Sequence, residues 1–274
     1  MQFGSHNLNL SFPHVMGILN VTPDSFSDGG KHNTFTSAVK HANKMIEQGA
    51  TFIDVGGEST RPGAAPVSVE EELDRVIPVI EALRNHTDCV ISVDTSKPQV
   101  MKEAVSAGAG LINDVRALQL PGAIEVASEV GVPVCLMHMQ GQPDSMQDNP
   151  LYNNVVDEVT DFLLGRVSDC ERAGISTDRI LLDPGFGFGK TLEHNYLLLK
   201  KLPELMKHGF PLLVGMSRKS MIGQLLDRKL DERLAGSIAL ATIAAQMGAQ
   251  IFRVHDVQET MDAVRIVKMM REVE

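Results

Sequence analysis

Short apolar segments alternate with longer amphipathic segments along almost the whole chain. The short segments are rich in Val and Ile and lack the polar alternation of a half-exposed strand. Such segments are typical of strands that are buried on both faces of a parallel sheet. Eight of them stand out: HVMGILN, TFIDVGG, CVISVD, GLIND, VPVCLMH, ILLDPG, PLLVGMS and QIFRVH.

The longer segments have helical periodicity and helix start signals. In the segment 68–85 the apolar residues form one stripe at helical intervals, and Ser68 and Glu71 have the spacing of a capping box. The segment KPQVMKEAVSAGA has Pro98 near its start and Gly108 past its end, where helices favour these residues. Similar patterns predict helices over 36–48, 121–130, 151–173, 193–208, 231–248 and 256–272.

Eight strands that are each followed by a helix predict an α/β fold, a closed TIM (β/α)8 barrel in a single domain. A doubly wound open sheet is the alternative, and an error of one unit in the strand count would favour it. Residues 1–13 precede the repeat, and we expect them to form a short hairpin that covers the floor of the barrel. Residues 14–274 then form the catalytic barrel domain.

Composition narrows the classes of partner. The chain of 274 residues has a net charge of −10, few aromatic residues and no Trp, which argues against nucleic acid and anionic membranes. No apolar segment is long enough to span a bilayer, and no signal peptide is evident. The three cysteines, Cys89, Cys135 and Cys170, lie far apart without a C-x-x-C motif, so we expect buried or free thiols in a reducing compartment. The predicted location is the cytoplasm.

Active sites of (β/α)8 barrels lie at the C-terminal ends of the strands. Nearly every predicted strand of this chain ends in a side chain that can form hydrogen bonds or carry charge. Capping of the following helix would explain any one of them, but eight converging ends indicate a binding site. The residues are Asn20, Asp54, Glu58, Arg61, Asp94, Asn113, Met137, His138, Asp183, Ser217, Arg218, Lys219, Arg253 and His255.

These residues offer two kinds of chemistry. Asp94, Asn113 and Asp183 are short acceptors, which suit a heterocycle whose edge presents N–H donors. The cationic side chains suit phosphates, and they are Arg61, Arg218, Lys219, Arg253 and His255. The predicted ligand therefore has a polar ring at one end and an anionic group at the other.

The glycine-rich stretch DPGFGFGKT, residues 183–191, follows the sixth predicted strand. It is not a P-loop, because Pro184 stands where the first glycine is required, and its alternating glycines do not fit the dinucleotide fingerprint. We interpret the three glycines as a sharp turn that leaves space for a ring bound by Asp183. A plain tight turn is the alternative, and Lys190 is then expected to be an ordinary surface lysine.

Two long polar segments follow the first two strands, NVTPDSFSDGGKHNTF and GGESTRPGAAPVS. They exceed the usual strand-to-helix connection and indicate lids or binding loops, with disordered insertions as the alternative. Phe26 is an aromatic residue in polar surroundings, which suggests contact with an apolar or aromatic substrate. His138 is expected to pack at the rim of the barrel rather than to bind a metal.

Seven segments, in order, resemble the dihydropteroate synthases: GILNVTPDSFSDGG, DVGGESTRPGA, SVDTSKP, GLINDV, LLDPGFGFGKT, GMSRKSMIG and FRVHDV. The resemblance runs from about residue 14 to the C-terminus. That family consists of TIM barrel transferases that join 6-hydroxymethyl-7,8-dihydropterin diphosphate to p-aminobenzoate in folate biosynthesis. The products are 7,8-dihydropteroate and diphosphate, and sulfonamides compete with p-aminobenzoate.

The resemblance also implies roles for individual residues. The pterin ring would contact Asp94, Asn113, Met137, Asp183 and Lys219. The diphosphate would contact Asn20, Thr60, Arg61, Arg253 and His255, with Asn20 as a ligand of Mg²⁺. The p-aminobenzoate would contact Phe26, Pro62, Phe186, Lys219 and Ser220. The residues implied in catalysis are Arg61, Lys219, Arg253 and His255, with Ser217 and Arg218 in supporting roles.

The expected mechanism is loss of diphosphate followed by attack of the arylamine. The departing anion would be stabilised by Mg²⁺, Arg and His side chains, and the neutral arylamine needs no strong base. The resemblance implies ordered binding, in which diphosphate shapes the long loops that then surround p-aminobenzoate.

Two other functions remain to be separated from this one. A pterin-dependent methyltransferase also has a barrel with Asp and Asn at strand ends, but it needs no loops that capture a diphosphate and an arylamine, and STRPG favours the synthase. A catalytically inactive pterin-binding scaffold is the third class.

The segment 231–248 is apolar nearly all round, which predicts a second buried surface, and the resemblance implies a homodimer. Deep burial inside the monomer is the alternative.

Overall fold

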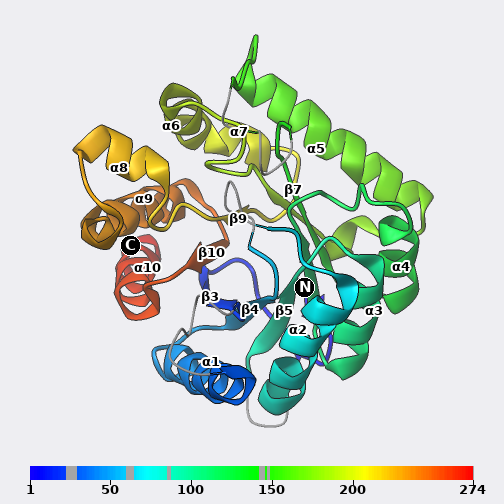
Figure 1. The fold of residues 1–274 in the computed structure, drawn as a ribbon. Helices are drawn as coiled ribbons and strands as arrows, with labels where there is room; N and C mark the ends of the chain where they lie inside the picture. The colour runs from blue at the N-terminus through cyan, green and yellow to red at the C-terminus, as the bar shows by residue number, and fades with distance from the viewer. Residues whose placement is uncertain (23–29, 60–64, 85–87, 142–145, 147–148, 274) are drawn as a thin grey trace.

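Eight parallel strands form the centre of the molecule. The computed structural model describes residues 1–22, 30–59, 65–84, 88–141, 146 and 149–273 (Figure 1). Within them the strands are hydrogen-bonded in the order β8-β7-β6-β5-β4-β3-β10-β9. Their bounds are β3 His14–Asn20, β4 Phe52–Gly56, β5 Val90–Asp94, β6 Leu111–Asp114, β7 Val134–Met137, β8 Ile180–Asp183, β9 Leu213–Val214 and β10 Ile251–Val254.

The first and last strands of that order meet. Leu182 of β8 forms a parallel bridge with Leu212, which directly precedes β9. The Leu182 N–H also donates to the Pro211 carbonyl at 3.0 Å. The sheet therefore closes on itself, as a barrel does and a doubly wound sheet does not. The predicted TIM barrel is confirmed.

Helices surround the barrel on its outer side (Figure 1). Each lies between two successive strands of the barrel or follows the last one, and its apolar face packs against the sheet. The bounds are α1 Gly30–Glu47, α2 Val69–Arg84, α3 Pro98–Ala107, α4 Ala123–Val130, α5 Val155–Arg172, α6 Leu192–Lys200, α7 Leu202–Met206, α8 Ser220–Leu226, α9 Leu234–Met247 and α10 Val257–Glu272. Within the described ranges, none of these helices combines the length and the apolar composition that a membrane span requires.

The helix predictions differ from the structure in three places. Helix α1 starts at Gly30, six residues before the predicted start at 36, so the end of the first long polar segment is helical. The segment 193–208 is not one helix, because Pro203 lacks an N–H and its ring would clash with the carbonyl four residues earlier. Lys201 leaves helical geometry instead, and α7 starts beyond it. The short helix α8 was not predicted, since it contains Gly223 and its first residue has no capping side chain.

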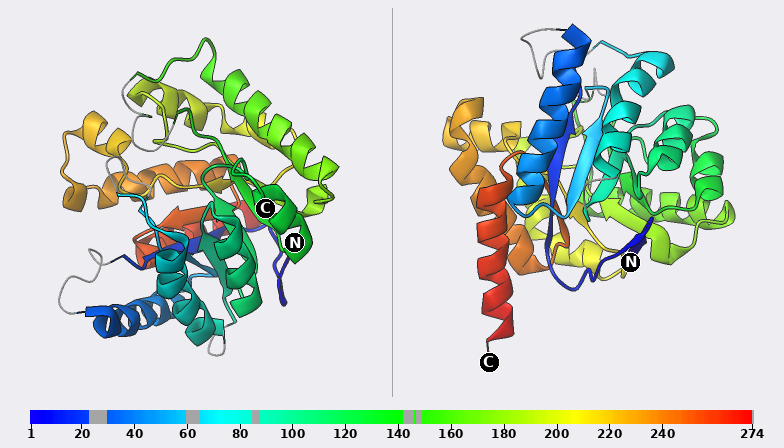
Figure 2. Two further views of the ribbon diagram at one scale, coloured as in Figure 1. Left: turned by 45° about the vertical axis from the view of Figure 1, so that its right-hand side comes forward. Right: turned by 90° about the horizontal axis from the view of Figure 1, so that it is seen from below.

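The N-terminal residues form the predicted hairpin. Strands β1 (Gln2–Phe3) and β2 (His6–Asn7) pair antiparallel, and this segment lies across the lower end of the barrel (Figure 2, right). The ring of Phe3 is fully buried and meets the ring of Phe52 edge-on, with 5.1 Å between their centroids. The hairpin therefore covers the floor of the barrel, as expected.

A buried layer of side chains fills the barrel directly above this hairpin. Each of the eight strands contributes one residue, and Phe3 completes the layer from below. Its members are Phe3, Met16, Phe52, Val90, Leu111, Cys135, Leu181, Leu213 and Ile251. None of Cys135, Cys89 and Cys170 forms a disulfide, and all three are buried as predicted. The interior below the strand ends is thus packed, as in other barrels of this kind.

Candidate functional site

The barrel places the predicted polar residues at one end. Asn20, Asp94, Met137 and Asp183 are the last residues of their strands, and Arg253 lies near the end of β10. Strand register sets several of them side by side, because Gly56 pairs with both Asn20 and Asp94, and Asp94 pairs with Asn113. The convergence that the sequence predicted is therefore present.

The guanidinium of Arg253 bridges two carboxylates at the centre of this end. Its Nε donates to Asp54 Oδ2 and its Nη2 to Asp94 Oδ2, both at 2.6 Å. Asn113 Nδ2 donates to the same Asp54 oxygen at 3.1 Å. Asp54 is fully buried, and its other oxygen accepts no hydrogen bond from the described residues. Acidic and basic groups are thus in direct contact rather than in separate zones.

The sequence interpretation gave Asp54 no role. A charged residue in the middle of the apolar run TFIDVGG was the available signal, because a buried charge is costly unless it is paired. Its carboxylate holds both Arg253 and Asn113. We therefore add Asp54 to the candidate site as a residue that orients its neighbours.

The buried ion pairs shift the acidity of their members. Burial raises the pKa of Asp94 to about 7, with Asp54 adding to the rise and Arg253 opposing it. Burial acts to lower the pKa of Arg253, but Asp54 and Asp94 outweigh it and the net shift is upward. Arg253 is therefore a permanent cation, whereas Asp94 changes charge near neutral pH.

Lys219 reaches the site from the start of α8. Its Nζ donates to the Phe186 carbonyl and lies 4.2 Å from the centroid of the Phe188 ring. Burial lowers the pKa of Lys219 to about 8, with Arg253 acting in the same direction and Asp183 opposing it. The side chain is therefore a cation at neutral pH that loses its proton more readily than a surface lysine.

Asp183 and the glycine-rich stretch form a compact turn. Asp183 Oδ1 accepts the Gly185 N–H at 2.7 Å, and burial raises the pKa of this carboxyl while Lys219 opposes the rise. The three glycines have φ of 68°, 79° and 61°, in the left-handed region that favours glycine. The turn was correctly predicted, but its glycines have a different neighbour from the one expected.

Protein atoms occupy the space beside these glycines. A Cβ on Gly185 would lie 1.9 Å from the His138 carbonyl oxygen, and one on Gly189 would lie 2.4 Å from the Gln140 oxygen. A Cβ on Gly187 would come within 2.9 Å of Lys219 Cδ. The glycines therefore admit the loop after β7 and the Lys219 side chain, which favours the tight-turn alternative over clearance for a ligand ring.

The expectation of a surface Lys190 is wrong. Lys190 is 3% exposed, and its Nζ lies 2.9 Å from His138 Nδ1. Burial lowers the pKa of His138 to about 3, with Lys190 adding to the effect. The His138 ring packs edge-on against Phe162 at 5.0 Å. His138 is thus a neutral packing residue beside the rim, as predicted.

The residues predicted to contact the diphosphate lie only partly within the described residues. His255 Nδ1 lies 3.1 Å from Ser217 Oγ, which also accepts the His255 N–H at 3.2 Å. This contact agrees with the supporting role given to Ser217. Arg218 instead pairs with Asp256 through both Nε and Nη2, so its charge is already balanced outside the group of strand-end residues.

Other predicted residues lie elsewhere or beyond the described part. Glu58 does not join the group, because it pairs with Lys97 at 2.6 Å and accepts the Val67 N–H at 3.1 Å. Phe186 is fully buried in the core, and Ser220 is exposed at the start of α8. The predictions for Phe26, Thr60, Arg61 and Pro62 fall outside the described residues.

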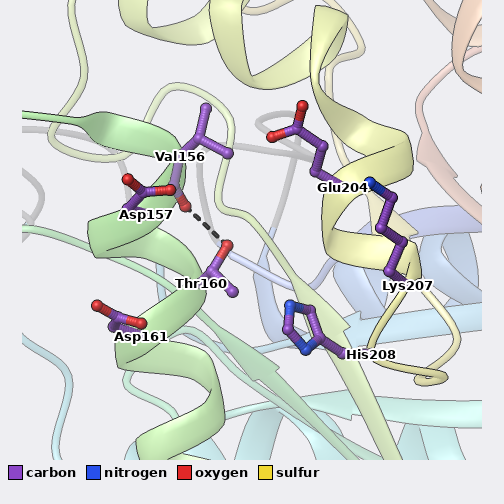
Figure 3. A pocket seen from close by; sticks show the side chains of 7 residues that line it. All are labelled: Val156, Asp157, Thr160, Asp161, Glu204, Lys207 and His208. Carbon is purple, nitrogen blue, oxygen red and sulfur yellow. Dashed lines mark hydrogen bonds between the residues drawn. The ribbon is translucent and has the colours of Figure 1, made fainter.

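A groove of about 370 Å³ lies in the outer layer between α5 and α7 (Figure 3). Its sides are polar, and Thr160 Oγ1 donates to the Val156 carbonyl at 2.7 Å within it. None of its lining residues belongs to the strand ends: Val156, Asp157, Thr160, Asp161, Glu204, Lys207 and His208. The candidate site therefore remains the set of side chains at the strand ends, which we call the strand-end group: Asn20, Asp54, Asp94, Asn113, Met137, Asp183, Lys219, Arg253 and His255.

A barrel with paired carboxylates and cations at its strand ends defines this chain, and the family model of the pterin binding enzymes matches its residues 16–255. The chain belongs to this family. Dihydropteroate synthase of Escherichia coli (strain K12) is 63% identical over 262 residues, which cover 96% of this chain and 93% of the relative. That of Haemophilus influenzae is 56% identical over 259 residues, with 94% of each chain covered.

Solved structures agree with these relatives. Yersinia pestis dihydropteroate synthase with a sulfonamide drug has a TM-score of 0.95 and 57% identity, with all of both chains covered. The Xanthomonas albilineans enzyme with 4-aminobenzoic acid has a TM-score of 0.93 and 53% identity over 97% of this chain and 96% of the other. Within its family, the chain is thus a member of the dihydropteroate synthases.

Proposed function

We propose that the strand-end group of this chain catalyses the dihydropteroate synthase reaction. As a transferase of the dihydropteroate synthase family, the chain joins 6-hydroxymethyl-7,8-dihydropterin diphosphate to p-aminobenzoate and releases diphosphate. The observation that carries the proposed site is the Asp54–Arg253–Asp94 bridge with Asn113 beside it. It sets acceptors for a heterocycle and a permanent cation for a departing anion within one network.

The pterin ring is assigned to the buried acceptors. Asp94, Asn113 and Asp183 are each less than a tenth exposed, so a ring that they bind is shielded from water and its hydrogen bonds are strong. Met137 packs beside them at the end of β7. Lys219 lies close enough to Asp183 for each to shift the pKa of the other, and its ammonium suits a polar ring edge.

The diphosphate is assigned to Arg253 and His255, with Thr60 and Arg61 of the second long segment. Arg253 then has to exchange part of its pairing with Asp94 for the phosphate oxygens. That exchange leaves the Asp94 carboxylate available to accept N–H groups of the pterin ring. Binding of one end of the substrate therefore favours binding of the other.

Mg²⁺ is assigned to Asn20 together with the substrate. Among the described residues no three His, Cys, Asp or Glu side chains converge as a metal site. A Cβ on Gly56 would lie 3.7 Å from Asn20 Oδ1 and 3.6 Å from Asp94 Oδ2, so these two oxygens occupy one corner. Mg²⁺ usually takes one or two protein oxygens and completes its octahedron with phosphates and water. The residues fit an ion of that kind, which when bound would neutralise charge on the leaving diphosphate.

The p-aminobenzoate is assigned to the rim. Ser220 is exposed at the start of α8, directly after Lys219. Phe26 and Pro62 of the long segments and Phe186 of the glycine turn complete the predicted set. The C–O bond to diphosphate breaks first, and Arg253 and His255 stabilise the negative charge that collects on the leaving group. The arylamine then attacks the methylene carbon and releases one N–H proton to solvent.

The pterin-dependent methyltransferase is the less favoured reaction. The relatives that are more than half identical to this chain are named dihydropteroate synthases, and a structure of this family holds 7,8-dihydropteroate. A methyl acceptor would have no use for the cationic residues at the rim.

A turnover assay with the two substrates tests the proposed roles. Arg253→Met is expected to lower kcat/KM by about 10²–10³, the usual cost of removing one charge-stabilising donor. Arg172→Met, on an arginine whose side chain is 74% exposed, is the control and should keep wild-type activity. Wild-type kinetics in Arg253→Met would refute the assignment, and methyl transfer without synthase turnover would favour the rival.

We further propose that the chain is a cytoplasmic homodimer that associates through α9 and α10. Large apolar side chains are exposed on these helices, among them Ile243, Ile266, Met269 and Met270. Contiguous exposed apolar residues of this kind favour a protein partner over solvent. Sedimentation of the wild type is expected to give a dimer, and Ile243→Lys with Ile266→Lys a monomer. A monomeric wild type at micromolar concentration would refute the dimer.

A further inference from the structure

The buried amine of Lys190 lies at the centre of the glycine turn. Its Nζ is 2.9 Å from the carbonyl oxygens of Gly185 and Phe188, and equally close to His138 Nδ1. Buried carbonyls of an irregular segment are costly unless a donor reaches them. A lysine amine has at least two N–H donors in either protonation form, so Lys190 satisfies both carbonyls of the turn at once.

Other side chains hold the remaining backbone groups of this turn. Asn195 Oδ1 accepts the Gly187 N–H at 2.7 Å, and the Tyr152 hydroxyl donates to the Gly189 carbonyl at 2.8 Å. The Phe186 carbonyl is left for Lys219, whose Nζ donates to it. The turn is therefore fixed on its inner side by Lys190 and presents one carbonyl to a residue of the candidate site.

We propose that Lys190 is a positioning residue for the synthase reaction, which acts by holding the turn 183–189 so that the Phe186 carbonyl and the Phe188 ring fix the ammonium of Lys219. Lys190 itself does not contact the substrates. This inference rests on the role assigned to Lys219 under the proposed function. It gives the lysine of GFGK a role distinct from that of the phosphate-binding lysine of a P-loop.

The charged groups around Lys190 also connect it to Lys219. The titratable groups that face Lys190 are His138 from the loop after β7, Asp183 from β8, and Lys219 before α8. Burial lowers the pKa of Lys190 well below its usual range; Asp183 opposes this shift and Lys219 adds to it. The Phe186 carbonyl stabilises the charged form of Lys219, whose Nζ donates to it, so release of the turn on loss of Lys190 should let Lys219 lose its proton at lower pH.

The variant Lys190→Met tests the inference, because it keeps the length of the side chain and removes its donors. We expect kcat/KM to fall about 10- to 100-fold, the usual effect of a misplaced site residue. The alkaline limb of the pH profile, expected near pH 8 from Lys219, should move downward. Lys200→Met, on an exposed lysine of α6, is the matched control and should change neither quantity.

A double-mutant cycle separates positioning from general damage. If Lys190 acts through Lys219, then Lys190→Met should cost little in a Lys219→Met background, because residues that act as a unit are not additive. Equal losses in both backgrounds would overturn the inference. So would a Lys190→Met enzyme with the wild-type pH profile.

A milder variant covers the case in which Lys190→Met does not fold. Tyr152→Phe removes only the donor to the Gly189 carbonyl on the same turn, and it should move the alkaline limb in the same direction by a smaller amount. An unchanged limb in a folded Tyr152→Phe enzyme would overturn the inference. An inactive wild type would instead refute the proposed function, so the two failures are distinguishable.

Discussion

Individual side chains at the strand ends have acidities that differ from those of surface groups, and this sets the pH range of binding. Asp94 has a pKa of about 7 because burial disfavours its charge. Below that pH the carboxyl is protonated, so it loses its charge and one acceptor oxygen. Above that pH the carboxylate pairs with Arg253 or with ring N–H donors.

Binding of a pterin should therefore strengthen as the pH rises through 7. We expect the affinity for 6-hydroxymethylpterin, measured by calorimetry from pH 6 to 8, to fall up to tenfold per unit below the pKa of Asp94. The variant Asp94→Asn should bind weakly at every pH, since an amide cannot become a carboxylate. A flat affinity profile in the wild type would contradict this role of Asp94.

At the residue scale, the sequence identified most of the strand-end residues but not which of them contact one another. Asp94, Asn113, Asp183 and Arg253 follow from their places at strand ends, because the barrel brings those ends together. The sequence did not reveal that Arg253 bridges two of the carboxylates, since such contacts join residues far apart in the chain. The error at Lys190 has the same cause, as its partner His138 lies 52 residues away.

At the scale of elements, the connection after β8 is determined by steric contact. Gly185 has φ of 68°, and a side chain there would meet the backbone oxygen of His138. Alternating glycines indicate a turn of this kind from sequence alone. The identity of the crowding atoms depends on the packing of two loops and does not follow from local sequence.

The variant Gly185→Ala should be strongly destabilised, because the His138 backbone oxygen lies 1.9 Å from the new Cβ and the His138 N–H is held by the Asp183 carbonyl at 2.9 Å. We expect a loss of about 3 kcal/mol or more in the free energy of unfolding by urea, from strain and overpacking together. Gly209→Ala is the matched control. Gly209 has a φ of 82° with open space around its Cβ position, so only the left-handed strain of about 1 kcal/mol remains. Equal losses in both variants would show that crowding is unimportant.

Helix boundaries show the same division between local and distant causes. The interruption between α6 and α7 follows from Pro203, a local signal that outweighs the helical periodicity around it. Pro78, in contrast, lies inside α2 without ending it. The tertiary packing of Val76, Val79 and Ile80 against the sheet offsets its cost, and the sequence alone does not separate the two cases.

At the scale of the whole molecule, the strand count and the hairpin were both predictable. Eight buried segments, each followed by a helix, leave few topologies other than a barrel. The layer of nine side chains that closes its lower end was not predicted residue by residue. Its composition depends on which face of each strand points inward, and uniformly apolar strands do not reveal that from their pattern.

Phe3 should contribute more to stability than its place in a terminal hairpin suggests. Phe3→Ala removes a fully buried ring from the floor layer, and we expect a loss of about 3–5 kcal/mol in the free energy of unfolding. Phe12→Ala, on a 38% exposed ring that contacts Lys268, should cost about 1 kcal/mol or less. Urea denaturation distinguishes the two, and a small loss in Phe3→Ala would mean that the hairpin only lies against the barrel.

The packed floor also restricts the order in which molecules enter and leave the site. A cavity that is sealed at one end admits molecules only in a stack, so the deepest occupant must enter first and leave last. A pterin that must reach Asp94 and Asp183 cannot enter while another molecule occupies the rim above them. We therefore expect surplus p-aminobenzoate to slow each cycle by obstructing the entry of the pterin, a form of inhibition that a tunnel open at both ends would not display.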